Sequence, residues 1–498
     1  FVPLLLSQEI IFSSKLKRKT GLIFFSTYLT FLLWNGFTTY WLIYSTVVGG
    51  VFAIVVNALL MAFVFTLGFV VRRRTNFRVG SLFLISLWLS LEYMHLHWDF
   101  AWPWLNLGNV FSATTAWVQW YDITGTFGGS LWVWVANLLL FNLLISYLKK
   151  KSISYKKLAF AGTAMLVPIL FSLVYTPKDL TTQSAEVILI QPNIDPYSEK
   201  YHTDNLDIVR LIDSLSAPHL TENTRFIIAP ETTLAEDENI DRLATSDSYR
   251  NLRKLTQQHK NLHILTGISL HKVFKDSSLI NIHSNYYPSG DFWYNTYNSA
   301  LFVGQEKQPH IYHKSKLVVG VETFPYKSIL EPIVGRYMID LGGTVALRTT
   351  QADRSTFITR TDSIGVAPII CYESVFGEFV TKYIAHKADF LAIITNDAWW
   401  DNTEGHRQHL ALARLRAIET RRWIARSANT GISAIIDHKG NVVQSLGYDQ
   451  LGTVVGDVRL NNQETFYVKH GDYIARVAVF MAGFTFLFSF WKPVRKRK

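Results

Sequence analysis

The sequence contains one cysteine, Cys371, which lies in the run PIICYES between an apolar stretch and Glu373. With a single cysteine the chain can form no intramolecular disulfide, no CxxC redox pair and no multi-cysteine zinc site. Cys371 is therefore a buried filler, a lone reactive thiol or an intermolecular linker. An isolated buried cysteine is most often a filler, so a reactive role needs further support from other residues.

Two residues at the ends of other apolar runs could supply that support. A cysteine attacks as the thiolate, which requires a base and a nearby positive charge. Glu231 ends the run RFIIAPE and is a candidate base, because partial burial raises a carboxyl pKa toward a useful range. Lys314 in YHKSKLVVGVE is a candidate donor to an oxyanion. Glu and Lys at strand ends are more often solvated, so spacing alone leaves both interpretations open.

Further candidates lie close to these residues in the sequence. Glu322 follows Lys314 by eight residues, and Glu373 follows Cys371 by two, so either carboxylate could orient the lysine. Lys316 is a rival to Lys314. The Tyr-x-Lys position and the interval to Glu322 favour Lys314.

The elements that must position these groups fall between residues 178 and 472, where short apolar runs end in polar residues. We expect buried strands within 187–193, 225–231, 263–270, 298–304, 365–373, 389–397 and 431–440. Apolar residues at three- and four-residue spacing predict helices over 205–215 and 407–428. This alternation predicts an α/β layered domain, preceded by a linker over 176–186.

Long apolar, aromatic-rich stretches flank that domain, and each has the length of about 18–25 residues that crosses a bilayer as a helix. They cover 20–44, 48–71, 79–97, 123–147, 157–175 and 474–491. So many long runs with so few charges would be hard to bury in a soluble core, so we expect membrane spans. Residues 1–13 look like a shortened further helix, and the chain starts at Phe, so we expect that N-terminal sequence is missing.

Basic clusters predict the orientation of these spans. They lie near 15–19, 72–78, 149–157 and 492–498, whereas the loops near 45–50 and 98–122 contain no Lys or Arg. Short basic loops stay in the cytoplasm, so we expect the 176–472 segment on the opposite side. The net charge of +11 belongs to the membrane edges, because residues 178–472 carry 30 Lys+Arg against 34 Asp+Glu. A nucleic-acid partner is therefore not expected.

Two other local signals favour simpler interpretations. His406 and His409 in GHRQH have a helical spacing that could bind a metal, but no third ligand is evident, so no metal site is expected. Glu92 lies in an apolar span, where ionisable groups are costly and often functional, although near the outer end it could reach interfacial water. The Trp-rich loop 98–120 is either an interfacial belt or a lipid entrance.

Five motifs in chain order carry a family resemblance: APE, YNSALF, YHKSKLVVGVE, CYES and NDAWW. This order resembles the carbon–nitrogen hydrolase, or nitrilase, superfamily and its Glu-Lys-Cys triad. With spans on both sides, FAWPWLNLGN at 100–109 and the segment 407–437, the whole chain resembles one branch, the apolipoprotein N-acyltransferases of bacterial inner membranes. The resemblance implies a polytopic α-helical membrane domain plus a nitrilase-like α-β-β-α sandwich.

The resemblance also implies a division of the chain and a role for each residue. We expect transmembrane helices over 1–175, a periplasmic catalytic domain over 176–472 and a C-terminal transmembrane helix with a basic tail over 473–498. Glu231 is implied as general base, Lys314 as stabiliser of the tetrahedral intermediate and Cys371 as nucleophile. The implied supporting residues are Glu322, Glu373, Tyr372 and Asn298, and the candidate substrate-binding residues are Tyr201, Trp399 and Trp400.

The family activity implied is a ping-pong acyl transfer in the bilayer that needs no cofactor. Cys371 would take an acyl chain from a membrane phospholipid as a thioester and pass it to the N-terminal amine of a diacylglyceryl-modified apolipoprotein. Two alternatives stay open: a membrane-bound nitrilase-type amidase, or an acyltransferase with another amine acceptor, and a non-enzymatic nitrilase-like scaffold.

Some positions depart from the family pattern. The family usually has Leu-Val-Pro-Phe-Gly-Glu after the lysine, whereas residues 317–322 read LVVGVE. The spacing to Glu322 is kept but the rigid proline turn is not. Ala229 precedes Pro230 where a tryptophan is common, and Tyr201 stands where a tryptophan lines the acyl pocket. These differences could alter lipid preference, and none of them removes a member of the triad.

Overall fold

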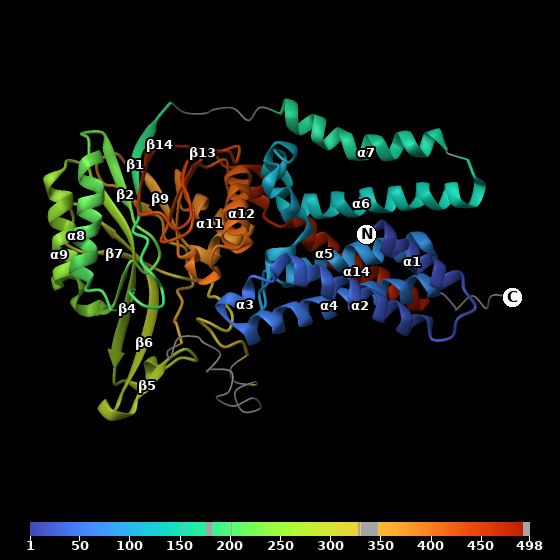
Figure 1. Ribbon diagram of the computed structural model, residues 1–498, viewed down its shortest axis with the longest axis horizontal. Coiled ribbons are helices and arrows are strands. Elements are labelled where there is room, and N and C mark those ends of the chain that lie inside the picture. Colours follow the sequence, from blue (N-terminus) through green and yellow to red (C-terminus); the bar gives the residue numbers. More distant parts are fainter. Residues whose placement is uncertain (153, 176–181, 201, 327–328, 330–346, 492–498) are drawn as a thin grey trace. The chain divides into compact units, whose positions relative to one another are not determined.

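The computed structural model describes residues 1–152, 154–175, 182–200, 202–326, 329 and 347–491. The chain divides into two compact units. One comprises Phe1–Ile43, Val48–Thr176 and His470–Lys498, and the other comprises Tyr44–Val47 and Pro177–Lys469. The first unit is helical and the second contains the sheets (Figure 1).

Long helices form the first unit. They are α1 (Val2–Ser13), α2 (Lys19–Thr39), α4 (Val47–Arg74), α5 (Phe77–Met94), α6 (Tyr121–Lys150), α7 (Tyr155–Val174) and α14 (Tyr473–Trp491). Five of them, α4, α5, α6, α7 and α14, are long and apolar enough to cross a membrane, which confirms five of the six predicted spans. The remaining predicted span, 20–44, forms α2, which interleaves Ser, Thr and Asn with its apolar residues and is not among the five.

Large apolar side chains on these helices face outward. Phe37 on α2 is 80% exposed and Phe480 on α14 is 71% exposed. A soluble protein rarely exposes a contiguous apolar surface, whereas a bilayer solvates it. The chain is therefore a multi-pass membrane protein.

Glu92, near the end of α5, does not reach interfacial water as the sequence allowed. Its side chain is buried. Its Oε1 accepts hydrogen bonds from Trp88 Nε1 at 2.9 Å and from the main-chain amide of Leu107 at 2.8 Å. Glu92 thus anchors part of the Trp-rich loop 98–120 to α5.

The second unit contains two mixed sheets. The first has the order β14 (Gly452–Arg459), β1 (Ser184–Gln191), β2 (Thr224–Ile228), β4 (His263–Phe274), β6 (Phe292–Val303) and β5 (Asn285–Tyr287). In addition, β3 (Leu234–Asn239) pairs with β4, and β7 (His310–His313) pairs with β6. Strands β1, β2 and β4 run parallel, which suits their largely apolar sequences because parallel strands are buried on both faces.

The second sheet lies face to face with the first. Its order is β13 (Val442–Leu446), β12 (Ser433–Ile436), β11 (Ile424–Ala428), β10 (Phe390–Thr395), β9 (Gly365–Ile370) and β8 (Phe357–Ile358). The rings of Phe226 on β2 and Phe390 on β10 lie 5.2 Å apart. Ser427 Oγ on β11 donates a 2.7 Å hydrogen bond to the carbonyl of Ile190 on β1. These contacts form the core between the sheets.

Helices cover the outer faces of both sheets (Figure 1). Helices α8 (Asn205–Ser216) and α9 (Asp247–Gln258) lie on the first sheet, and α11 (Gly377–Ala385) and α12 (Glu404–Thr420) lie on the second. Ile212 of α8 and Leu252 of α9 share a buried core with Ile227 of β2. The α-β-β-α sandwich predicted from the sequence is confirmed.

The predicted helix 407–428 is wrong in its second part. Helix α12 ends at Thr420, and Arg421 adopts a left-handed conformation with φ 53°. Residues Ile424–Ala428 then form β11, which is buried and pairs with β10 and β12. The helical periodicity of the sequence continues across this break, but pairing in the centre of a sheet overrides local helix preference.

Candidate active site

Three strand ends bring the candidate residues together. Glu231 follows β2 by three residues, Lys314 comes directly after β7, and Cys371 comes directly after β9. Because β2 and β7 belong to the first sheet and β9 belongs to the second, the site lies where the two sheets meet at their strand ends.

Glu231 and Lys314 form a buried ion pair. Lys314 Nζ lies 2.8 Å from Glu231 Oε1, and Asn298 Nδ2 on β6 donates to the same oxygen at 2.8 Å. Glu231 Oε2 accepts from the main-chain amide of Asn396 at 3.2 Å. Burial opposes ionisation of Glu231, but the charge and hydrogen bond of Lys314, helped by Lys200 and Asn298, outweigh it and lower the pKa of this carboxyl. Glu231 is therefore a carboxylate at neutral pH.

Glu322 holds the other side of the same ammonium. Its Oε2 lies 2.9 Å from Lys314 Nζ, and its Oε1 accepts from Asn298 Nδ2 at 2.8 Å. The turn that lacks the family proline bends at Gly320, which has φ +80°, and Val318 donates its amide to Glu322 Oε2 at 2.8 Å. Burial lowers the pKa of Lys314, but the two carboxylates raise it well above its ordinary value. The lysine is therefore a permanent cation.

Cys371 occupies a tight turn between β9 and a 3₁₀ turn over Cys371–Val375. Its φ of 50° is left-handed, a conformation that is uncommon for a residue other than glycine. Burial, together with the charges of Glu231 and Asp397, raises the pKa of the thiol, and Lys314 and a hydrogen bond with Thr395 only partly oppose this. Without substrate, Cys371 is therefore a neutral thiol.

Glu373 does not contact the lysine ammonium. Its carboxylate accepts from the main-chain amides of Ser315 at 2.6 Å and Ile370 at 2.8 Å, and from the Tyr312 hydroxyl at 2.7 Å. Burial raises the pKa of Glu373 to about 7, although these hydrogen bonds and the charge of Lys314 oppose the rise. Glu373 thus joins the segments that carry Lys314 and Cys371.

The remaining predicted residues line the surroundings. Tyr372 is buried and packs edge-on against Phe376, with ring centres 5.1 Å apart. Trp399 packs edge-on against Tyr197 at 5.1 Å, and Trp400 packs edge-on against His409 at 5.5 Å. Tyr201 lies outside the described residues.

Sequence reasoning did not assign a polar network beneath Cys371. Asp397 Oδ1 lies 2.9 Å from His409 Nδ1, and Asp397 Oδ2 lies 2.5 Å from Arg426 Nη2. His409 Nε2 lies 3.3 Å from the carbonyl oxygen of Cys371 and 3.0 Å from Ser374 Oγ. The motifs NDAWW and GHRQH contained two of these residues, but neither motif indicated that they meet. The network supports the main chain of the cysteine turn.

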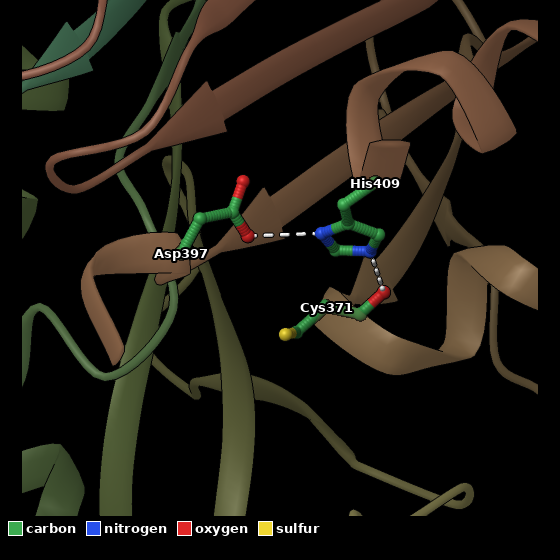
Figure 2. Close-up of side chains that lie close together, drawn as sticks. All are labelled: Cys371, Asp397 and His409. Atoms are coloured by element: carbon green, nitrogen blue, oxygen red, sulfur yellow. Dashed lines mark hydrogen bonds and ion pairs between the residues drawn. The ribbon is translucent and has the colours of Figure 1, made fainter. Parts of the chain in front are cut away.

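Metal coordination does not fit this network well, although one ligand atom from each of Cys371, Asp397 and His409 lies within 4.8 Å of the others. Figure 2 shows the thiol pointing away from the imidazole, whose contact with Cys371 is made by the carbonyl oxygen. Arg426 already neutralises the Asp397 carboxylate. His406, the other histidine of GHRQH, instead stacks on Tyr448 with ring centres 4.5 Å apart.

Lys200 is a further residue that the sequence did not indicate. Its side chain is buried beside the Glu231 turn, where Nζ donates to the main-chain carbonyl of Glu231 at 3.4 Å and to the hydroxyl of Thr232. It lies in the loop between β1 and α8, in a stretch with no recognisable motif. Nothing in the sequence pattern distinguishes it from a surface lysine.

Two family models match the chain. The model of the carbon–nitrogen hydrolase family covers residues 186–466, and the model of the apolipoprotein N-acyltransferase N-terminal domain covers residues 1–139. Among solved structures, Saccharomyces cerevisiae Nit3, a member of branch 10 of the nitrilase superfamily, aligns at 15% identity with a TM-score of 0.39. That alignment covers 59% of this chain and 96% of the other.

Curated relatives match over most of the length. An apolipoprotein N-acyltransferase from Chlorobaculum tepidum is 30% identical over 509 residues, covering 100% of this chain and 91% of the relative. Another from Geobacter metallireducens is 26% identical over 410 residues, covering 80% of this chain and 73% of the relative. With matches over both the membrane helices and the sandwich, the chain belongs to the apolipoprotein N-acyltransferase family.

Proposed function

We propose that this chain transfers a fatty acyl group from a membrane phospholipid to the N-terminal amine of a diacylated apolipoprotein, through a thioester on Cys371. The observation that carries the proposal is the Lys314 ammonium held between Glu231 and Glu322 at the strand ends that also carry Cys371. The membrane-spanning helices and the family membership support lipid substrates.

In the first half-reaction Glu231 acts as general base. Because the free thiol is neutral and Glu231 is ionised, the proton moves from Cys371 to Glu231 as sulfur attacks the ester carbonyl. An ammonium has three N–H groups, and the contacts with Glu231 and Glu322 leave one for the oxyanion. The ester C–O bond then breaks, Glu231 returns the proton to the leaving alkoxide, and a lysophospholipid departs from the thioester.

In the second half-reaction an amine takes the acyl chain. The α-amine of the diacylglyceryl-modified cysteine attacks the thioester carbonyl and gives a proton to Glu231. The C–S bond breaks, an amide forms, and the Cys371 thiolate recovers the proton from Glu231. A thioester suits this scheme, because it stores the acyl group and remains reactive toward an amine.

The other residues support these steps in the proposal. Asn298 and Glu322 fix the ammonium of Lys314 against Glu231. Glu373 fixes the distance between the segment that carries Lys314 and the segment that carries Cys371. The residues proposed to line the acyl or substrate pocket are Tyr372, Tyr201, Trp399 and Trp400.

The proposed location follows from the charges of the membrane helices. Helix α4 ends in Arg72, Arg73 and Arg74, and α6 ends in Lys149 and Lys150. Basic residues of this kind stay in the cytoplasm, so the catalytic segment 176–472 is assigned to the periplasmic side of a bacterial inner membrane, between the membrane segments 1–175 and 473–498.

The test uses the purified chain in phospholipid and then a diacylated lipopeptide. We expect an acyl mass adduct on Cys371 that hydroxylamine removes and that Cys371→Ser lacks. We then expect the lipopeptide to gain one acyl chain on its N-terminal amine. Release of ammonia from an amide, without acylation, would favour an amidase. No adduct from a folded chain would favour a scaffold.

A further inference from the structure

Lys200 is buried, with 6% of its surface exposed, in a part of the site that the proposed reaction does not use. Lysines are almost never buried to this degree unless their charge is paired. Among the residues that the structure describes, Lys200 Nζ donates to two neutral oxygens, the carbonyl of Glu231 and the hydroxyl of Thr232. Burying the ammonium of Lys200 away from water costs free energy, so its position calls for a role in the site.

The electrostatic surroundings of Lys200 connect it to the reacting residues. Burial lowers its pKa to about 8, the negative charges of Glu231 and of ionised Cys371 oppose this, and the positive charges of Arg348 and Lys314 reinforce it. Lys200 is therefore close enough to both Glu231 and Cys371 for its charge to act on them. At neutral pH most of it is protonated.

The charge count of the site shows what this lysine contributes. Glu231 and Glu322 share one cation, Lys314, so this trio has a net charge of −1 before Cys371 ionises. A thiolate that forms by losing its proton to solvent adds a second negative charge in a buried site, where like charges repel strongly. When Glu231 takes the proton instead, the net charge of the site stays at −1. With Lys200 protonated, the net charge is zero before the attack and stays zero while Glu231 holds the proton of Cys371. It becomes −1 only when that proton is lost to solvent.

We propose that Lys200 is the second cation of the site, whose charge balances the surplus carboxylate and so favours the Cys371 thiolate and the oxyanion that follows. It acts on the thiol through its electric field and not through a direct contact. The inference rests on Cys371 being the nucleophile of the proposed function.

The proposal predicts a specific pH dependence of thiol reactivity. Cys371 also faces Glu231, Lys314, Asp397 and Tyr372, and all four are present when Lys200 is replaced. Replacing Lys200 also removes one of the charges that lower the pKa of Glu231. Lys200 loses its proton as the pH rises through about 8, so its support for the thiolate fades in this range. Arginine keeps its charge throughout, so Lys200→Arg retains the support above pH 8.

The experiment measures alkylation of Cys371 by iodoacetamide between pH 6 and 10, with the full chain in detergent and the adduct quantified by mass. We expect Lys200→Met to slow alkylation at pH 7 by about tenfold or more, equivalent to a rise of about one unit in the apparent thiol pKa. We expect Lys200→Arg to react at least as fast as the wild type, with its advantage growing above pH 8. The control is Lys272→Met, which removes a half-exposed lysine paired with Asp241 and should leave the profile unchanged.

Coinciding profiles for the wild type and Lys200→Met would overturn the proposal. If Lys200→Met does not fold, Lys200→Arg provides the test. An alkylation rate that rises above pH 8 no more in Lys200→Arg than in the wild type would also overturn the proposal. Alkylation needs neither phospholipid nor lipopeptide, so the two proposals fail separately. Acyl transfer with unaltered alkylation would reject the role of Lys200 alone, and altered alkylation without acyl transfer would reject the proposed function alone.

Discussion

The carboxylate of Glu373 accepts a 2.6 Å hydrogen bond from the main-chain amide of Ser315, the residue that follows Lys314. The same carboxylate accepts a 2.8 Å hydrogen bond from the amide of Ile370, the residue that precedes Cys371. Because these segments leave different sheets, one buried side chain fixes the lysine segment to the cysteine segment. The separation of Lys314 from Cys371 therefore depends on a carboxylate that accepts from main-chain amides in both segments.

Glu373→Gln should change how stability depends on pH. The pKa of Glu373 is raised from 4.5 to about 7, so between these values the folded chain binds more protons than the unfolded chain. Stability therefore falls as the pH rises through this window, by about 3 kcal/mol for this group alone. Glutamine does not titrate, so we expect the unfolding temperature of Glu373→Gln to decline less between pH 5 and 7 than that of the wild type.

Glu404→Gln is the matched control for this prediction. Glu404 is half-exposed and pairs with Arg407 on the surface of α12, so the substitution should leave the pH profile of the wild type in place. Parallel profiles for the wild type and Glu373→Gln would show that Glu373 keeps an ordinary pKa.

The strands that carry chemistry were predictable because their apolar runs end next to the polar residues concerned. The runs before Glu231 and Cys371 became β2 and β9. The run before Asn396 became β10. Burial of a parallel strand demands a continuous apolar run, which is visible in one sequence. Lys314 could be placed only through its motif, since its strand β7 is short and half-polar.

The contacts around the site were not predictable in the same way. Lys200 lies in a loop, and only the fold brings it beside the Glu231 turn. Asp397, His409 and Arg426 come from separate elements, and their meeting depends on how α12 and β11 pack on the second sheet. The break between α12 and β11 was also missed, because pairing between strands decides it and local periodicity does not.

Lys314→Met should remove acyl transfer, and Lys316→Met should not. Without Lys314 the carboxylates of Glu231 and Glu322 remain buried without their cation, and the oxyanion loses a donor. Loss of such a donor costs about 100- to 1,000-fold in rate. The Lys316 ammonium instead lies over the Phe376 ring, 4.9 Å from its centre. The two variants are compared by their rates of thioester formation. A similar loss of rate in each would contradict the assignment of Lys314.

Gly267→Ala should displace Glu231. A Cβ at Gly267 would lie 2.2 Å from the amide nitrogen of Thr232 and 2.6 Å from Cα of Glu231, and both are backbone atoms that cannot move aside independently. A displacement of about 1 Å in a catalytic group costs on the order of 100-fold in rate. At Gly447 the nearest atoms lie 3.5 Å away on the Gln450 side chain, so Gly447→Ala should retain activity. The acyl-transfer assay compares the two variants. Equal activity would show that the turn at Glu231 accommodates the added methyl group without loss of activity.

Arg426→Met should destabilise the chain far more than the same change at an exposed arginine. Arg426 and Asp397 are both fully buried and 2.5 Å apart, so removing the arginine takes away the cation paired with Asp397 beside the Cys371 turn. Asp397 keeps its contacts with His409 and the Thr395 hydroxyl. Breaking a buried pair in this way costs about 3–5 kcal/mol, whereas an exposed pair is worth about 0–1 kcal/mol. Arg407 pairs with Glu404 at the surface, with side chains 56% and 49% exposed, and Arg407→Met is the matched comparison.

Thermal unfolding in detergent should separate the two variants clearly. Equal unfolding temperatures would mean that Asp397 takes up a proton or is supported by another group when Arg426 is absent, and the network would then not depend on the arginine.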